Sequence, residues 1–92
     1  MNIQEILSQR QERYGDFSDN ADTSQALKSI MRATRQWDSL PNAGKEALDN
    51  IQQKIARILN GDPLYEDSWF DIVGYAQLAL EEVEKNNHWK NS

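Results

Sequence analysis

The sequence contains no cysteine, and its one histidine, His88, lies in a polar segment. Without cysteine the chain has no disulfide framework, no thiolate nucleophile, and no zinc ribbon or iron–sulfur cluster. With a single histidine it has neither a histidine-rich metal cluster nor a conventional Ser/His/Asp triad. Carboxylates are therefore the remaining candidate metal ligands, because oxygen ligands suit hard cations.

Long apolar runs are also missing. No stretch approaches the ~18 apolar residues that a membrane helix needs, and residues 1–5 show no basic or apolar leader pattern. We therefore expect a soluble, cytoplasmic protein with no membrane partner. Acidic residues outnumber basic ones by 15 to 10, a formal net charge of -5 that predicts no direct binding to nucleic acid backbones.

Proline and glycine are scarce, with two and four residues, whereas three Trp, three Tyr and two Phe supply aromatic area for a core. The 92 residues suffice for one domain. We predict a single helical domain over residues 1–85 and a polar C-terminal tail over residues 86–92. A chain of this size buries only roughly 60–65% of its unfolded surface, so we expect a homo-oligomer, a dimer or tetramer, to supplement its stability.

Apolar spacing predicts an all-α fold, a four-helix bundle without strands. The expected helices cover about residues 2–14, 23–38, 43–60 and 67–85. The third has the clearest apolar stripe, formed by Leu48, Ile51, Ile55 and Ile58. Asn42 and Asp67 stand where N-caps of the third and fourth helices are expected.

The aromatic residues are interpreted mainly as core. Phe17 is expected to anchor the loop after the first helix. Trp37, Trp69 and Tyr75 lie within apolar helix stripes. The fourth helix carries apolar residues on more than one stripe, which predicts burial on two sides, one of them against a second subunit.

Four carboxylates are the candidate metal ligands: Glu46, Asp49, Asp67 and Asp71. Within each helix the pair is three or four residues apart, so both side chains project from one face. Such a cluster suits Mg²⁺, although a solvated acidic face near helix N-termini explains the same pattern. In a simple antiparallel hairpin the two pairs would lie several turns apart. Convergence therefore requires strongly crossed or offset helices, or a second subunit.

The candidate phosphate ligands are basic residues on two helices. Lys54 and Arg57 follow the carboxylates on the third helix, and Lys28 lies on the second. These cations are suited to bind phosphate oxygens. The alternative is that they pair with polar side chains on the same helix. The turn Tyr14-Gly15-Asp16-Phe17 offers two aromatic rings that stack on a base, or that pack a plain helix stop.

Several segments together resemble a family of small phage and prophage proteins. These are Tyr14-Gly15-Asp16-Phe17, Leu27-Lys28, Trp37, residues 45–49, residues 54–61 and residues 67–76. Through the third and fourth helices, that family is similar to the MazG-like, all-α nucleotide pyrophosphohydrolases. The resemblance implies a MazG-like bundle completed by oligomerisation, in the host cytoplasm if the chain is phage-encoded.

The MazG-like pattern, Glu-Glu-x-x-Glu on one helix and Glu-x-x-Asp on a later one, binds Mg²⁺ and positions water for hydrolysis. It falls here on residues 45–49 and 68–71, with Lys45 and Ser68 in place of two glutamates. The resemblance implies Glu46, Asp49 and Asp71 as catalytic residues, which together with Asp67 hold the Mg²⁺. It also implies substrate contacts from the four residues Lys54, Arg57, Tyr14 and Lys28.

The expected function is therefore nucleotide binding, with Mg²⁺-dependent hydrolysis of nucleoside triphosphates to monophosphate and pyrophosphate. The two missing glutamates keep a different class open, a non-catalytic phage counter-defence protein. Such a protein sequesters a nucleotide signal, or inhibits a host defence protein through its acidic surface. A purely structural helical oligomer is a third possibility.

Overall fold

The computed structural model of the chain describes the backbone of residues 2–91 and the side chains of residues 2–87. Its helices are α1 (Ile3–Tyr14), α2 (Phe17–Arg32), α3 (Asn42–Asn60) and α4 (Glu66–Asn91), with a short 3-10 turn, η1 (Trp37–Ser39), after α2. The part of the chain that is described contains no strand. The expectation of an all-α fold with four helices is thus confirmed.

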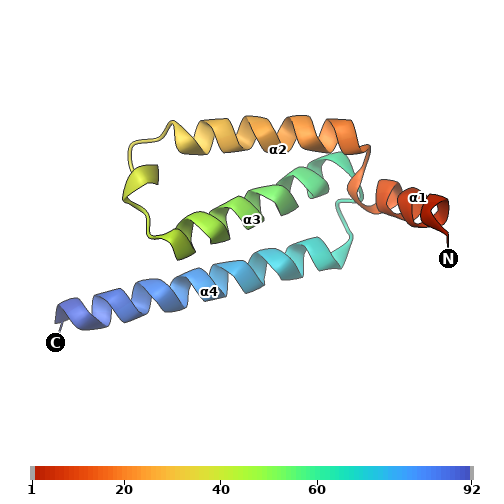
Figure 1. Ribbon diagram of the computed structural model, residues 1–92. Helices are drawn as coiled ribbons and strands as arrows, with labels where there is room; N and C mark the ends of the chain where they lie inside the picture. The colour runs from red at the N-terminus through yellow and green to blue at the C-terminus, as the bar shows by residue number, and fades with distance from the viewer. Residues whose placement is uncertain (1, 92) are drawn as a thin grey trace.

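The helices form an open layer. Figure 1 shows α3 between α2 and α4, antiparallel to both, while α1 projects from the end at which α2 begins and α3 ends. The molecule is elongated, with extents of 54 × 26 × 22 Å. Because α2 and α4 lie on opposite sides of α3, both broad faces of this layer reach solvent.

The first two helices meet at a tight turn. The side chain of Asn2 caps α1 by accepting a hydrogen bond from the Glu5 amide at 2.9 Å, and Gly15 ends the helix with a φ of 83°. α2 begins directly afterwards, six residues before the predicted start at residue 23. The prediction that Phe17 anchors a loop was wrong. As the first residue of α2, its ring is directed outward and is 84% exposed.

α2 ends at Arg32, not at the predicted residue 38. The chain then turns through η1, which buries Trp37 as predicted. The Arg32 guanidinium lies over the Trp37 ring, 4.9 Å from its centroid. The connection from α2 to α3 is therefore fixed by one aromatic side chain instead of by a longer helix.

Two predicted caps were also wrong. Pro41 occupies the N-cap position of α3, and Asn42 is its first helical residue. α4 begins at Glu66, so Asp67 lies inside its first turn, where its carboxylate accepts a hydrogen bond from the Tyr65 hydroxyl at 2.8 Å. α4 then continues to Asn91, beyond its predicted end near residue 85.

The core is small and centred on α3. Its buried apolar residues are Ala47, Ala56 and Ile58, together with Trp37. Trp69, predicted to be mainly core, is 52% exposed, and its indole nitrogen donates to the Pro63 carbonyl. With so few buried apolar side chains, the single chain gains little stability from burial.

Two glycines, Gly15 and Gly61, allow the backbone at the end of α1 to lie against the end of α3. A Cβ on Gly15 would lie 2.0 Å from the Asn60 carbonyl oxygen, and one on Gly61 would lie 2.3 Å from the Arg13 carbonyl oxygen. The Asp62 amide also donates to the Arg13 carbonyl at 2.9 Å. The missing side chains allow the two backbones to touch, and this contact positions the residues of α1 described below.

Candidate functional site

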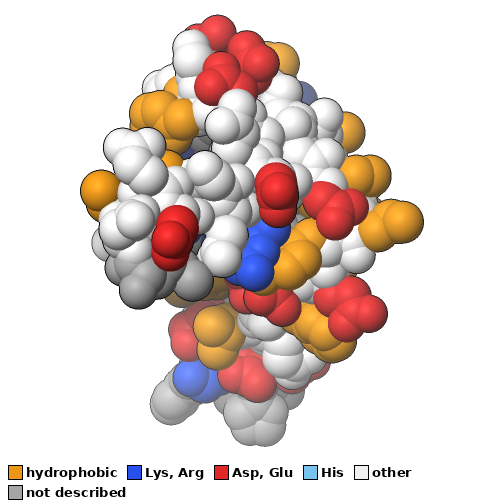
Figure 2. Space-filling view, turned by 90° about the vertical axis from the view of Figure 1, so that its right-hand side faces the viewer, with side chains coloured by type: hydrophobic (Ala, Val, Ile, Leu, Met, Phe, Trp, Pro, Cys, Tyr) orange, Lys and Arg blue, Asp and Glu red, His pale blue; other side chains and the backbone are white. Residues whose placement is uncertain are grey.

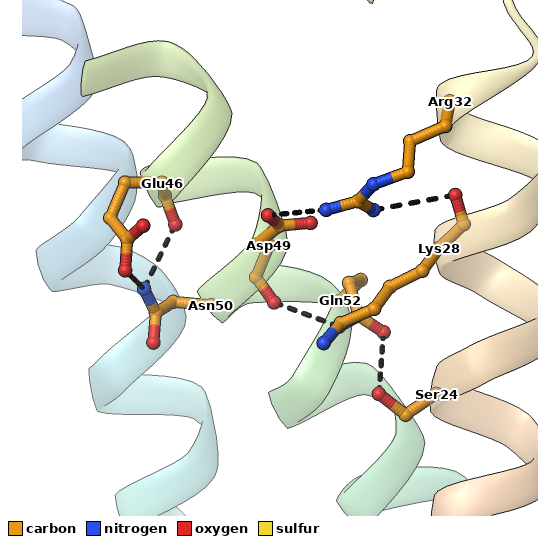
Figure 3. Close-up of polar contacts among 7 residues, drawn as sticks. All are labelled: Ser24, Lys28, Arg32, Glu46, Asp49, Asn50 and Gln52. Carbon is orange, nitrogen blue, oxygen red and sulfur yellow. Dashed lines mark hydrogen bonds and ion pairs between the residues drawn. The ribbon is translucent and has the colours of Figure 1, made fainter. Parts of the chain in front are cut away.

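The predicted carboxylates on α3 are engaged in local polar contacts. Asp49 forms an ion pair with Arg32 of α2 at 2.9 Å, and Glu46 accepts a hydrogen bond from the Asn50 side-chain amide (Figure 3). Asp49 is partly buried and its second oxygen has no hydrogen-bond partner among the described residues. Asp49 therefore serves mainly as the acidic partner of an ion pair that joins α3 to α2.

The carboxylates on α4 lie elsewhere. Asp71 pairs with Lys54 at 3.3 Å, which places it opposite the middle of α3, turns away from Glu46 and Asp49. The hydrogen bond to Asp67 raises the pKa of Tyr65 above its ordinary value. Among the described residues, no three acidic or histidine side chains lie close enough together to hold a metal ion. Within one chain, a hairpin keeps the two pairs apart, and the Mg²⁺ site stays a prediction.

A seam of buried polar contacts holds α2 against α3. The Ser24 hydroxyl donates to the Gln52 side-chain oxygen at 3.1 Å, and the Gln52 nitrogen donates to the Asp49 carbonyl (Figure 3). Further along, the Asn60 amide donates to the Thr23 hydroxyl. Sequence reasoning missed this seam because it looked for apolar periodicity, whereas this helix pair is joined by small and polar residues.

The structure brings together three of the four predicted substrate contacts. The Arg57 guanidinium lies 4.5 Å from the centroid of the Tyr14 ring, and Lys28 and Arg57 line the same surface hollow. Arg10, which sequence reasoning did not select, lies 5.1 Å from the centroid of that ring. Lys54 does not belong to this group, because it is buried and faces α4.

One broad side of the layer, which we call the apolar face, exposes hydrophobic side chains of α3 and α4. Its exposed members are Leu48, Ile55, Leu59, Trp69, Val73, Leu80 and Val83. Their spacing places the members of each helix on one side of it. A hollow of about 180 Å³ lies between the α3 and α4 members of this face and is lined by Leu48 and Val83 among others. Contiguous exposed hydrophobic side chains of this kind mark interaction surfaces.

Hydrophobic side chains also reach the surface at the end of the molecule near α1. Figure 2 shows them there, interspersed with acidic groups. Among the large hydrophobic residues described on α4, Phe70 and Val73 are the most exposed, at 67% and 65%, although the helix was predicted to be buried on two sides. Over its described side chains, α4 packs on one side against α3. None of the described helices combines the length and the hydrophobicity that a membrane crossing requires.

Comparison with known proteins gives one finding. A family model described as the Chlamydia-phage Chp2 scaffold matches residues 2–88 of the chain. No curated protein and no solved structure shows a significant match. No similarity to MazG-like proteins was found, whereas the expected relationship to small phage proteins is supported. Because the match extends over nearly the whole sequence, the chain belongs to the Chlamydia-phage Chp2 scaffold family.

Proposed function

We propose that this chain is an assembly scaffold of a small phage. It binds coat-protein chains while a particle forms. The observation that carries the proposal is the family match over residues 2–88. The small core and the apolar face support it, because they describe a chain with more hydrophobic surface than its own helices cover.

An assembly scaffold acts through non-covalent contacts between proteins. Covering apolar surface contributes about 25 cal/mol per Å² removed from water, so a face of exposed Leu, Ile and Val side chains supplies affinity without a deep pocket. Charged residues border this surface, and they favour register and solubility over tight binding. The partner surface is accordingly apolar, on coat protein or, before assembly, on a second copy of this chain.

The test is an assembly reaction with the coat protein of the phage that encodes the chain. Val73→Gln places a polar group on the apolar face, and we expect it to lower the yield of particles at least tenfold. Leu78→Gln is the matched control. Leu78 is 58% exposed on the same helix, but it lines a hollow with Asp71 on another side. Light scattering and electron microscopy measure the yield.

Two results contradict the proposal. One is that coat protein assembles equally well without the chain. The other is an equal loss of particles with Val73→Gln and Leu78→Gln, because the apolar face would then have no special role.

Nucleotide hydrolysis and counter-defence stay predictions. Incubation with nucleoside triphosphates and Mg²⁺ tests the first, through pyrophosphate release that Asp71→Asn abolishes. That variant also removes the partner of Lys54. Its unfolding must therefore be measured alongside, and an unchanged melting temperature makes a loss of turnover specific.

A further inference from the structure

A cleft at the junction of α1, α2 and α3 combines positive charge with exposed aromatic surface. We call it the cationic cleft. It consists of two adjoining hollows, of about 230 and 200 Å³, which share the three residues Arg10, Phe17 and Asn20. Tyr14 lines the first hollow, and Lys28 and Arg57 line the second. This cleft is a different surface from the apolar face.

The cations of the cleft have no acidic partner within the part of the chain that is described. The ion pairs formed among the described residues involve other cations, namely Arg32, Lys54 and Lys85. By contrast, the guanidiniums of Arg10 and Arg57 both lie about 5 Å from the centroid of one Tyr14 ring. Two positive charges held near one ring repel each other, and an anion bound close to both reduces that repulsion.

Phe17 gives the cleft its second property. Its ring is 84% exposed where the two hollows meet, beside Arg10. A flat ring stacked on it would remove apolar surface from water while leaving the polar edges of that ring accessible. One carboxylate, Asp16, lies in the first hollow, so the excess of positive charge is on the side of Lys28 and Arg57.

We propose that the cationic cleft binds a nucleotide unit, with the base stacked on Phe17 and the phosphate held by Arg10, Lys28 and Arg57. Guanidinium groups match phosphate oxygens in geometry and charge. The unit has two sources, a free nucleotide or a single-stranded nucleic acid. The net charge of -5 weakens general attraction to a nucleic acid backbone, whereas a local cluster of three cations acts within a Debye length. Binding here needs no metal ion.

The experiment is a calorimetric titration of the full chain at low salt with two probes, a ten-nucleotide oligothymidylate and thymidine triphosphate. Arg10→Gln and Lys28→Gln should each weaken binding at least fivefold. Arg35→Gln removes the same charge outside the cleft and should change affinity less than twofold. Phe17→Ala should weaken binding about five- to hundredfold, as expected for the loss of one base stack. Phe70→Ala, on α4, should not.

The salt dependence provides a second measurement. For the oligonucleotide, Arg10→Gln should reduce the slope of log K against log salt by about 0.7, and Arg35→Gln should leave it unchanged. Binding of the oligonucleotide alone identifies a single strand as the source, and equal binding of the triphosphate identifies a free nucleotide. Either result supports the site.

No binding of either probe overturns the proposal, as does equal weakening by Arg10→Gln and Arg35→Gln. Thermal unfolding of each variant shows whether a loss arises from misfolding. Lys28→Gln keeps the test decisive if a change at Arg10 disturbs α1. The titration contains no coat protein, so its failure is independent of a failure of the scaffold proposal.

Discussion

The two broad faces of the helix layer differ in chemistry. The apolar face presents Leu, Ile and Val side chains of α3 and α4, whereas the opposite side carries Lys28, Gln53 and Arg57. In a closed bundle one of these faces would be internal. Here α2 and α4 lie on opposite sides of α3, and both faces are accessible (Figure 1). A small layer of helices can thus offer one surface to proteins and another to a charged ligand.

This separation explains why the core is so small. α3 is covered by α2 on one side and by α4 on the other, and its residues Ala47, Ala56 and Ile58 are buried. The surfaces of α3 that face neither α2 nor α4 are exposed to solvent. Substitutions on one face should therefore leave the properties of the other face intact.

The largest effect is expected where α1 is attached. Gly15 has a φ of 83° and a ψ of -176°, and an added Cβ would meet the Asn60 carbonyl oxygen at 2.0 Å. Gly15→Ala should therefore lower the free energy of unfolding by about 2–3 kcal/mol, because this backbone region is nearly restricted to glycine. It should also weaken any ligand binding in the cationic cleft. Urea unfolding measures the first effect and calorimetry the second.

Gly74→Ala is the matched control for that change. Apart from its two chain neighbours and the surrounding backbone of α4, no atom of the described residues lies within 4 Å of a Cβ built at this position. Alanine should therefore raise the free energy of unfolding, by about 0.5–1 kcal/mol. A stability loss at Gly74 similar to that at Gly15 would contradict the packing described here.

A smaller effect is expected in the seam that separates the two faces. Gln52→Leu leaves the buried Ser24 hydroxyl without its partner, which should cost about 1–3 kcal/mol of unfolding free energy. The double variant Ser24→Ala/Gln52→Leu removes both polar groups and should recover most of that loss. A double-mutant cycle in urea checks the coupling. Additive losses would mean that the hydrogen bond does not join α2 to α3.

The next effect in size concerns the independence of the apolar face and the cationic cleft. Val73 is 65% exposed, so Val73→Gln should change the free energy of unfolding by no more than about 0.5 kcal/mol. The same variant should lose particle assembly and keep the affinity of the cationic cleft for its ligand. Phe17→Ala should show the reverse pattern. One purified preparation of each variant serves for both measurements. A variant that lost both particle assembly and ligand binding would contradict the independence of the two faces.

The smallest effect concerns the start of α4. The hydroxyl of Tyr65 donates to Asp67, and this hydrogen bond raises the pKa of Tyr65. Because the folded state holds the phenol proton more tightly, this stabilisation is present below the ordinary tyrosine pKa and is lost as pH rises through the raised value. Asp67→Asn should shift the pKa of Tyr65 down toward 10.0. Carbon NMR of the ring follows the titration, and an unchanged pKa would assign the shift to another cause.

The sequence predicted the ends of α1 and α3 within one residue, because Gly15, Pro41 and Gly61 mark them. It failed at the start of α2. Residues 18–25 are mainly polar, and this part of the helix buries only Ser24, so no apolar period marks it. A helix held by hydrogen bonds instead of hydrophobic packing is hard to find from hydropathy alone.

The candidate sites were predictable to different extents. A hairpin was expected to keep Glu46 away from Asp71, and the Lys54–Asp71 pair confirms that register. Residue types also pointed to Tyr14 and Arg57 as ligand contacts, and the structure places them together. Arg10 was not among the four predicted substrate contacts, because its proximity to Arg57 depends on the angle at which α1 leaves the layer, which the close backbone contacts at Gly15 and Gly61 fix.

The sequence by itself determined that the chain forms four α-helices and that their apolar residues are spread over several stripes. Helical period and turn residues are local properties, so they can be read without knowledge of the fold. Only the tertiary structure decided which stripe is buried and which remains exposed. The packing of α3 against α4 buries one stripe of α4 and leaves Val73 and Leu80, on another stripe, exposed.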